Sequence, residues 1–95
     1  MNRKECLEEA IRITTQDRQA SYGTPDACFR AIAEYWNTYI KSIDYRPLKG
    51  YDVAVMMALL KIARIPASPT KEDNWVDLAG YAANGVEVAG IEEKK

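Results

Sequence analysis

The sequence contains no histidine, so it lacks the side chain that most often acts as a general base and as a transition-metal ligand. Its two cysteines, Cys6 and Cys28, are too few for a zinc site of the usual four-ligand kind. Basic residues number 13 against 14 acidic ones, and no basic block occurs. Because nucleic acids are bound through extended positive surfaces, we expect no extended nucleic-acid partner, whereas a single nucleotide needs only a few charges.

Long apolar runs are also missing. No apolar stretch approaches the ~20 residues that span a bilayer, and the N-terminal "MNRKECLEEA" has no apolar signal region. We therefore expect no membrane partner and a reducing cytoplasmic location. In that compartment both cysteines are expected to be free thiols, buried as small apolar side chains.

The length of the chain, 95 residues, suits a single helical domain over residues 1–95, and its hydrophobic content of 47% is enough to build a core. A chain this short buries a smaller fraction of its surface than a longer one. An apolar chain of this size often completes its burial in an oligomer, so we expect self-association into a homo-oligomer.

Four segments have helical periodicity, and none alternates with a period of two residues. The pattern predicts an all-α fold, an antiparallel bundle of about four helices. The expected helices cover residues 3–20, 25–43, 51–65 and 70–88, and the tail from about residue 90 is expected to be mobile.

Turn chemistry separates the first two helices at "SYGTPD". Gly23 can adopt a left-handed conformation that ends a helix, and Thr24 and Pro25 suit the N-cap and first position of the next one. The second helix has the clearest apolar stripe, with Trp36 expected in the core. The third helix, "YDVAVMMALLKIAR", is apolar on nearly every side, which places it at the bundle centre or against a second subunit.

The fourth helix, expected to start at Thr70, has a polar stripe. Asp73, Asp77, Tyr81 and Asn84 follow one another at spacings of four, four and three residues, so they share one face. Small residues occupy other positions of this helix. Gly80 costs about 1 kcal/mol of helix propensity relative to alanine, which predicts that a neighbour packs close to the backbone there.

A short loop joins the third and fourth helices, so they should run antiparallel, with Lys61 and Arg64 within reach of Asp77 and Asp73. Two interpretations remain open. The charges form salt bridges between the helices, or the two aspartates hold Mg²⁺ while Lys61 and Arg64 contact the phosphates of a ligand.

Aromatic side chains could complete a nucleotide site by stacking on a base. Tyr22, in the "YG" turn, is the first candidate because a place in the core is hard to assign to it. Asp52, in the first turn of the third helix, is interpreted as an acidic residue stabilised by the helix dipole.

Three blocks of sequence, "DRQASYGTPDACFRAIAEYW", "YDVAVMMALLKIAR" and "DNWVDLAGYAA", occur in this order and carry a resemblance that covers about residues 3–85. They resemble a family of small uncharacterised proteins encoded by tailed phages and prophages. That family is distantly similar to the all-α MazG-type nucleoside triphosphate pyrophosphohydrolases, which are oligomeric and use Mg²⁺ to release pyrophosphate. The resemblance implies a MazG-like bundle in the cytoplasm of a bacterial host.

MazG-type enzymes hold Mg²⁺ with an E-x-x-E motif on one helix and an E-x-x-D motif on a later one. Here "DNWVD" stands at the second motif, with Asp77 as its last acid and Asn74 in place of its first. Asp73 is the nearest substitute for that first acid, and Glu72 is a poorer one.

The first motif departs further from the family pattern. An E-x-x-E formed by Glu5 and Glu8 lies on the first helix, whereas the central helix has Lys61 and Arg64. Losing half of the metal shell would weaken Mg²⁺ binding and the activation of a water. Mg²⁺-dependent pyrophosphohydrolysis, nucleotide binding without turnover, and a helical assembly role are the hypotheses that follow.

Overall fold

The computed structural model describes residues 1–17 and 24–94. This part of the chain contains no strand and four α-helices: α1 (Arg3–Arg12), α3 (Pro25–Ser42), α4 (Gly50–Arg64) and α5 (Glu72–Glu92). A π-helical turn (Ile13–Asp17) follows α1, and a 3-10 turn (Ile65–Ala67) follows α4. The all-α prediction is confirmed. None of the described helices is both long enough and apolar enough to cross a membrane.

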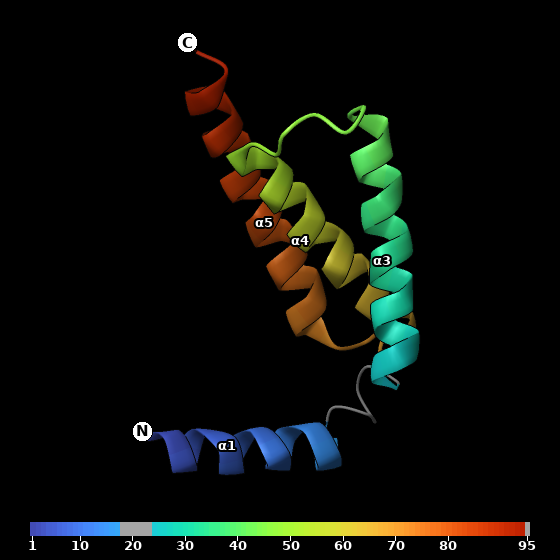
Figure 1. Ribbon diagram of the computed structural model, residues 1–95, viewed down its shortest axis with the longest axis vertical. Helices are drawn as coiled ribbons and strands as arrows, with labels where there is room; N and C mark the ends of the chain where they lie inside the picture. Colours follow the sequence, from blue (N-terminus) through green and yellow to red (C-terminus); the bar gives the residue numbers. More distant parts are fainter. Residues whose placement is uncertain (18–23, 95) are drawn as a thin grey trace.

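The first helix, α1, begins where the side chain of Asn2 accepts a hydrogen bond of 2.9 Å from the backbone N–H of Glu5. Figure 1 shows α1 running apart from the other three helices. Its apolar stripe includes Leu7 and Ile11, and both side chains are exposed. The predicted amphipathic helix is therefore present, but no described helix covers its apolar side. Its predicted continuation to residue 20 lies partly outside the described residues.

The second helix, α3, starts as predicted, with Thr24 extended at the N-cap and Pro25 at the first helical position. Its apolar stripe packs on α4. Ile32 is buried, and Trp36 donates a hydrogen bond of 2.7 Å from Nε1 to the carbonyl oxygen of Met56 in α4. Trp36 therefore fixes α3 against α4 with a polar contact as well as an apolar one.

Both cysteines are free thiols. The prediction that they are buried is wrong for Cys6, which is exposed because α1 lies apart from the other helices, and Cys28 is only half-buried. Phe29, next to Cys28, is also 65% exposed although it belongs to the apolar stripe. The start of α3 is thus poorly covered by the described part of the chain.

The third helix, α4, lies between α3 and α5, as Figure 1 shows. This arrangement confirms the predicted central position of the most apolar segment. The connection from α3 to α4 includes two non-glycine residues with positive φ, Asp44 (58°) and Tyr45 (57°). These left-handed residues turn the chain back toward α4.

The last helix, α5, starts two residues later than the predicted Thr70. The chain is still in a turn at Thr70, because the backbone N–H of Lys71 donates to the carbonyl oxygen of Ser68 (3.1 Å). Lys71 is the N-cap residue, and its side chain makes no capping hydrogen bond. The helix then continues to Glu92, four residues beyond the predicted end.

The last turn of α5 is bonded to the first turn of α4. Glu92 accepts hydrogen bonds from the backbone N–H groups of Gly50 (2.8 Å) and Tyr51 (2.9 Å). The ammonium group of Lys49 lies 3.0 Å from Oε1 of Glu93. A carboxylate from one helix therefore caps the start of the other.

Close packing between α4 and α5 occurs at a different glycine from the predicted one. A Cβ atom at Gly80 would meet no heavy atom within 4 Å, so the prediction of close approach there is wrong for contacts within one chain. A Cβ atom at Gly85 would lie 3.1 Å from Cβ of Ala54. Gly85 faces α4 and allows the two backbones to approach, whereas Gly80 lies on the exposed side of α5.

Candidate functional site

Lys61 and Asp77 join the end of α4 to the start of α5. The ammonium nitrogen of Lys61 lies 3.0 Å from Oδ2 of Asp77. The side chain of Lys61 is only 12% exposed, and that of Asp77 is 48% exposed. The antiparallel hairpin predicted from the short loop is present, and the salt-bridge interpretation holds for this pair.

Arg64 lies one turn after Lys61 at the end of α4 and is half-buried. Lys61 and Arg64 thus place two cations at the end of α4 that adjoins the start of α5. Because Asp77 pairs with Lys61, a second anion approaching here would share the charge of Lys61 with Asp77.

Glu72 and Asp73 occupy the first turn of α5, and both are exposed. At this position acidic side chains favour the positive end of the helix dipole, so they stabilise α5 without any ligand. Asp73 and Asp77 remain one turn apart on the same face.

Asn74 is the most unusual residue of this end of the hairpin. Its side chain is completely buried, and neither the amide nitrogen nor the amide oxygen has a hydrogen-bond partner. Buried polar groups are nearly always satisfied, and each unsatisfied one costs about 1–3 kcal/mol. Asn74 lies one turn from Asp77, so unmet hydrogen bonds and the Lys61–Asp77 pair occur at the same place.

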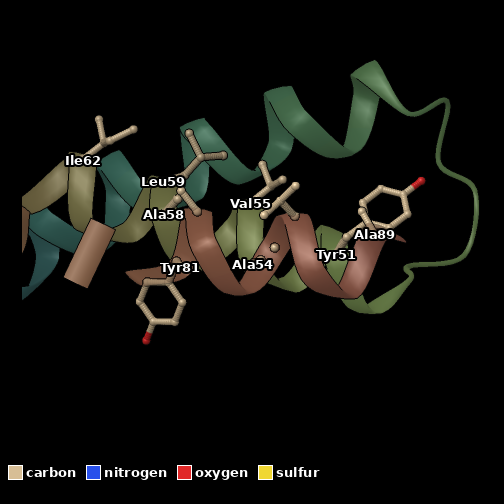
Figure 2. A pocket seen from close by; sticks show the side chains of 11 residues that line it. Tyr51, Ala54, Val55, Ala58, Leu59, Ile62, Tyr81 and Ala89 are labelled. Carbon is tan, nitrogen blue, oxygen red and sulfur yellow. The ribbon is translucent and has the colours of Figure 1, made fainter. Parts of the chain in front are cut away.

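The other residues predicted to contact a ligand do not lie together. Tyr81, half-buried, lines an apolar groove between α4 and α5, and Asn84 is exposed on α5. In Figure 2 the ring of Tyr81 extends away from the apolar side chains of the groove, with its hydroxyl outward. Tyr22 lies outside the described residues.

In the described ranges 1–17 and 24–94, no three or more cysteine, aspartate or glutamate side chains gather in a way that could hold a metal ion. The predicted donors for Mg²⁺ are Asp73, Asp77 and the weaker Glu72, and Asp77 already pairs with Lys61. Two carboxylates suit Mg²⁺ only when waters and phosphate oxygens supply the other ligands.

A second polar cluster, which the sequence interpretation missed, surrounds Asp52 in the first turn of α4. Its side chain is completely buried and accepts hydrogen bonds from the Arg46 guanidinium at 2.7 and 3.0 Å, the Lys49 backbone N–H at 2.7 Å and the hydroxyl of Tyr39. The Arg46 hydrogen bonds hold the pKa of the Asp52 carboxyl well below its usual range.

The same contact shifts the pKa of Tyr39 in the opposite direction. Burial, together with the hydrogen bond to Asp52, raises the pKa of the Tyr39 hydroxyl to about 12. Arg46 also donates to the hydroxyl of Tyr51 at 3.1 Å. Both carboxylate oxygens of Asp52 accept hydrogen bonds. Since the donors come from α3 and from the connection, the cluster joins both to α4. Its lone sequence signal is the Lys49–Asp52 spacing, which is that of a capping box.

A family model described as a domain of unknown function (DUF6378) matches residues 5–89 of this chain. The chain belongs to the DUF6378 family. It is 37% identical to the Gene 55 protein of Mycobacterium phage D29 and 40% identical to the Gene 55 protein of Mycobacterium phage L5, each over 76 residues. Each match covers 80% of this chain but 48% or 47% of the relative, so the chain spans about half the length of these proteins. No solved structure matches.

The predicted resemblance to small phage proteins is confirmed by these DUF6378 and phage matches, and the MazG similarity stays a prediction. The DUF6378 match includes the Lys61–Asp77 pair, Asn74 and the Asp52 cluster. It ends before Glu92, the residue that caps α4.

Proposed function

We propose that this DUF6378 protein binds a phosphate-bearing nucleotide at the end of the α4–α5 hairpin, in the cytoplasm of a bacterial host. The observation that supports the proposal is Asn74, whose buried amide has no hydrogen-bond partner and lies beside an ion pair whose lysine is mostly buried. An amide with free donor and acceptor positions can pair with a base or a ribose, and the pairing would recover the cost of burying it.

The cations of α4 suit the phosphates of such a ligand. Lys61 and Arg64 lie one turn apart, and a phosphate would compete with Asp77 for Lys61. Tyr81 would stack on the base from α5, with Tyr22 as the second aromatic candidate and Asn84 as an outer polar contact.

A second candidate function is Mg²⁺-dependent hydrolysis of a nucleoside or deoxynucleoside triphosphate to the monophosphate and pyrophosphate. The exposed carboxylates of Glu72 and Asp73, with Asp77 one turn later, favour it. Asp73 and Asp77 would hold the Mg²⁺, Glu72 being the weaker donor, and Mg²⁺ would supply charge neutralisation at the phosphates.

The first test is thermal stability with a panel of nucleoside and deoxynucleoside mono-, di- and triphosphates, with MgCl₂. Asn74→Leu removes the unsatisfied amide at similar volume, so the ligand-free melting temperature should stay equal or rise. The nucleotide-induced shift should disappear in Asn74→Leu and persist in the matched control Asn37→Leu, at an exposed position of α3. The absence of a shift by every nucleotide would overturn the proposal.

Chromatography of the same mixtures separates binding from hydrolysis. Release of pyrophosphate that Asp73→Asn abolishes would support the enzyme. A thermal shift with no product at high protein concentration would leave a binding module without catalysis.

A further inference from the structure

The chain exposes far more surface than a compact protein of its size. Its accessible surface is 6975 Å², whereas a compact 10.7 kDa monomer exposes about 5,500 Å². The radius of gyration is 15.8 Å, against about 12.4 Å expected for 95 residues. The excess of roughly 1,500 Å², to which the separate helix α1 contributes, is larger than the ~800 Å² that each partner buries in a standard interface.

Part of this surface is an apolar groove between α4 and α5, of about 440 Å³. It is lined by side chains of both helices, among them Ala54, Ala58 and Leu59 of α4 and Ala82, Gly85 and Val86 of α5. No charged residue lines it. In Figure 2 the side chains of Ala54, Val55, Ala58 and Leu59 lie between Tyr51 and Tyr81, and Ile62 lies beyond Tyr81.

The outer side of α5 continues this apolar surface. Between residues 74 and 91 the only charged residues are Asp77, which pairs with Lys61, and Glu87. Trp75, Val76 and Val86 are exposed on this helix, and Val86 is 73% exposed. Exposed apolar surface of this extent on a helix marks an interaction surface.

We infer that the α4–α5 groove is covered by a second copy of this chain, with α5 of each copy lying in the groove of the other. A two-fold interface places the same surface against itself, so charges near the axis would repel their own copies. The uncharged lining avoids this repulsion. The inference also gives a reason for Gly80 and Gly90, where a Cβ atom would meet nothing within 4 Å inside one chain: small residues let a second helix approach.

This inference shares Tyr81 with the proposed nucleotide site but does not rest on nucleotide binding. Its test is the mass of the full chain by sedimentation velocity over a range of concentrations. The expected mass is at least twice the 10.7 kDa of one chain. Val86→Arg should dissociate the assembly and raise the dissociation constant at least about tenfold, because it places a charge in the apolar contact. Ala82→Arg provides a second groove variant.

Val53→Arg is the matched control. Val53 is exposed on α4 to 52% and does not line the groove, so this variant should associate like the wild type. Far-UV circular dichroism should show equal helix content in all variants, because each substituted side chain is exposed. Ile11→Arg tests the exposed stripe of α1 as the alternative contact.

A wild type that is monomeric at every concentration would overturn the inference. So would an assembly that both groove variants leave intact, or one that Ile11→Arg dissociates while Val86→Arg does not. Dissociation by Val86→Arg and Ala82→Arg, with Val53→Arg and Ile11→Arg still assembled, is the result that supports it.

Discussion

Arg46 donates two hydrogen bonds, of 2.7 and 3.0 Å, to a single carboxylate, that of Asp52, which has no exposed surface. The side chain of Arg46 is one-third exposed. The pair thus joins a partly hydrated cation to a fully buried anion. Removing one partner should therefore change the free energy of unfolding by a different amount from removing the other.

Arg46→Ala should destabilise the fold by about 3 kcal/mol, because it leaves a buried carboxylate without its counter-ion. The matched control is Arg30→Ala, which breaks an exposed pair with Asp26 (3.1 Å) and should cost less than about 0.5 kcal/mol. Urea unfolding followed by circular dichroism measures both. Equal losses in the two variants would contradict the role of burial.

Stability should fall in acid because of the same carboxylate. The pKa of Asp52 is lowered in the folded state from an ordinary value of 3.8, so its contribution is fully present above that value and is lost as the pH falls through the folded pKa. The free energy of unfolding should therefore decrease as the pH drops below about 4. Asp52→Asn should flatten this decrease more than Asp26→Asn does, because the Asp26 side chain is exposed.

Asp77→Asn and Lys61→Met should have unequal effects although they break the same ion pair. Asp77→Asn leaves the mostly buried ammonium of Lys61 without a carboxylate and should cost about 1–3 kcal/mol. Lys61→Met leaves Asp77, which is half-exposed, to water and should cost less than about 1 kcal/mol. Chemical denaturation compares the two, and a larger loss for Lys61→Met would contradict the burial argument.

The two glycines of α5 should respond differently to alanine. In the Val86→Arg background, where only contacts within one chain count, Gly80→Ala should stabilise by about 0.5–1 kcal/mol through helix propensity. Gly85→Ala should gain less or lose stability, because its Cβ would lie 3.1 Å from Cβ of Ala54. Thermal unfolding of the two alanine variants distinguishes these outcomes. A larger gain in stability at Gly85 would show that α4 and α5 can move apart to accommodate the added methyl group.

Much of the helix placement could be predicted because its signals are local. The cap at Thr24 and Pro25 and the apolar stripe of α3 depend on residues within one or two turns. The Lys61–Asp77 pair followed from one further step, the short loop that makes α4 and α5 antiparallel.

The Asp52 cluster could not be predicted in the same way. Arg46 contacts Asp52 because Asp44 and Tyr45, in the connection before it, adopt positive φ. The types of these two residues do not predict that conformation. Likewise, the burial of Asn74 in the first turn of α5 depends on what packs over that turn, and helical periodicity does not contain that information. The prediction of close packing at Gly80 is wrong for a related reason. A glycine in a helix indicates that a neighbour could pack closely, but the sequence does not show which face of the helix that neighbour contacts.

The carboxylate of Glu92 has a consequence for how the protein opens. First-turn amide hydrogens of a helix normally exchange quickly with solvent, because no carbonyl inside the helix accepts them. Here the amides of Gly50 and Tyr51 donate to a side chain more than 40 residues away in the sequence. Exchange at the start of α4 therefore requires the end of α5 to detach, and the two helix ends behave as one cooperative unit.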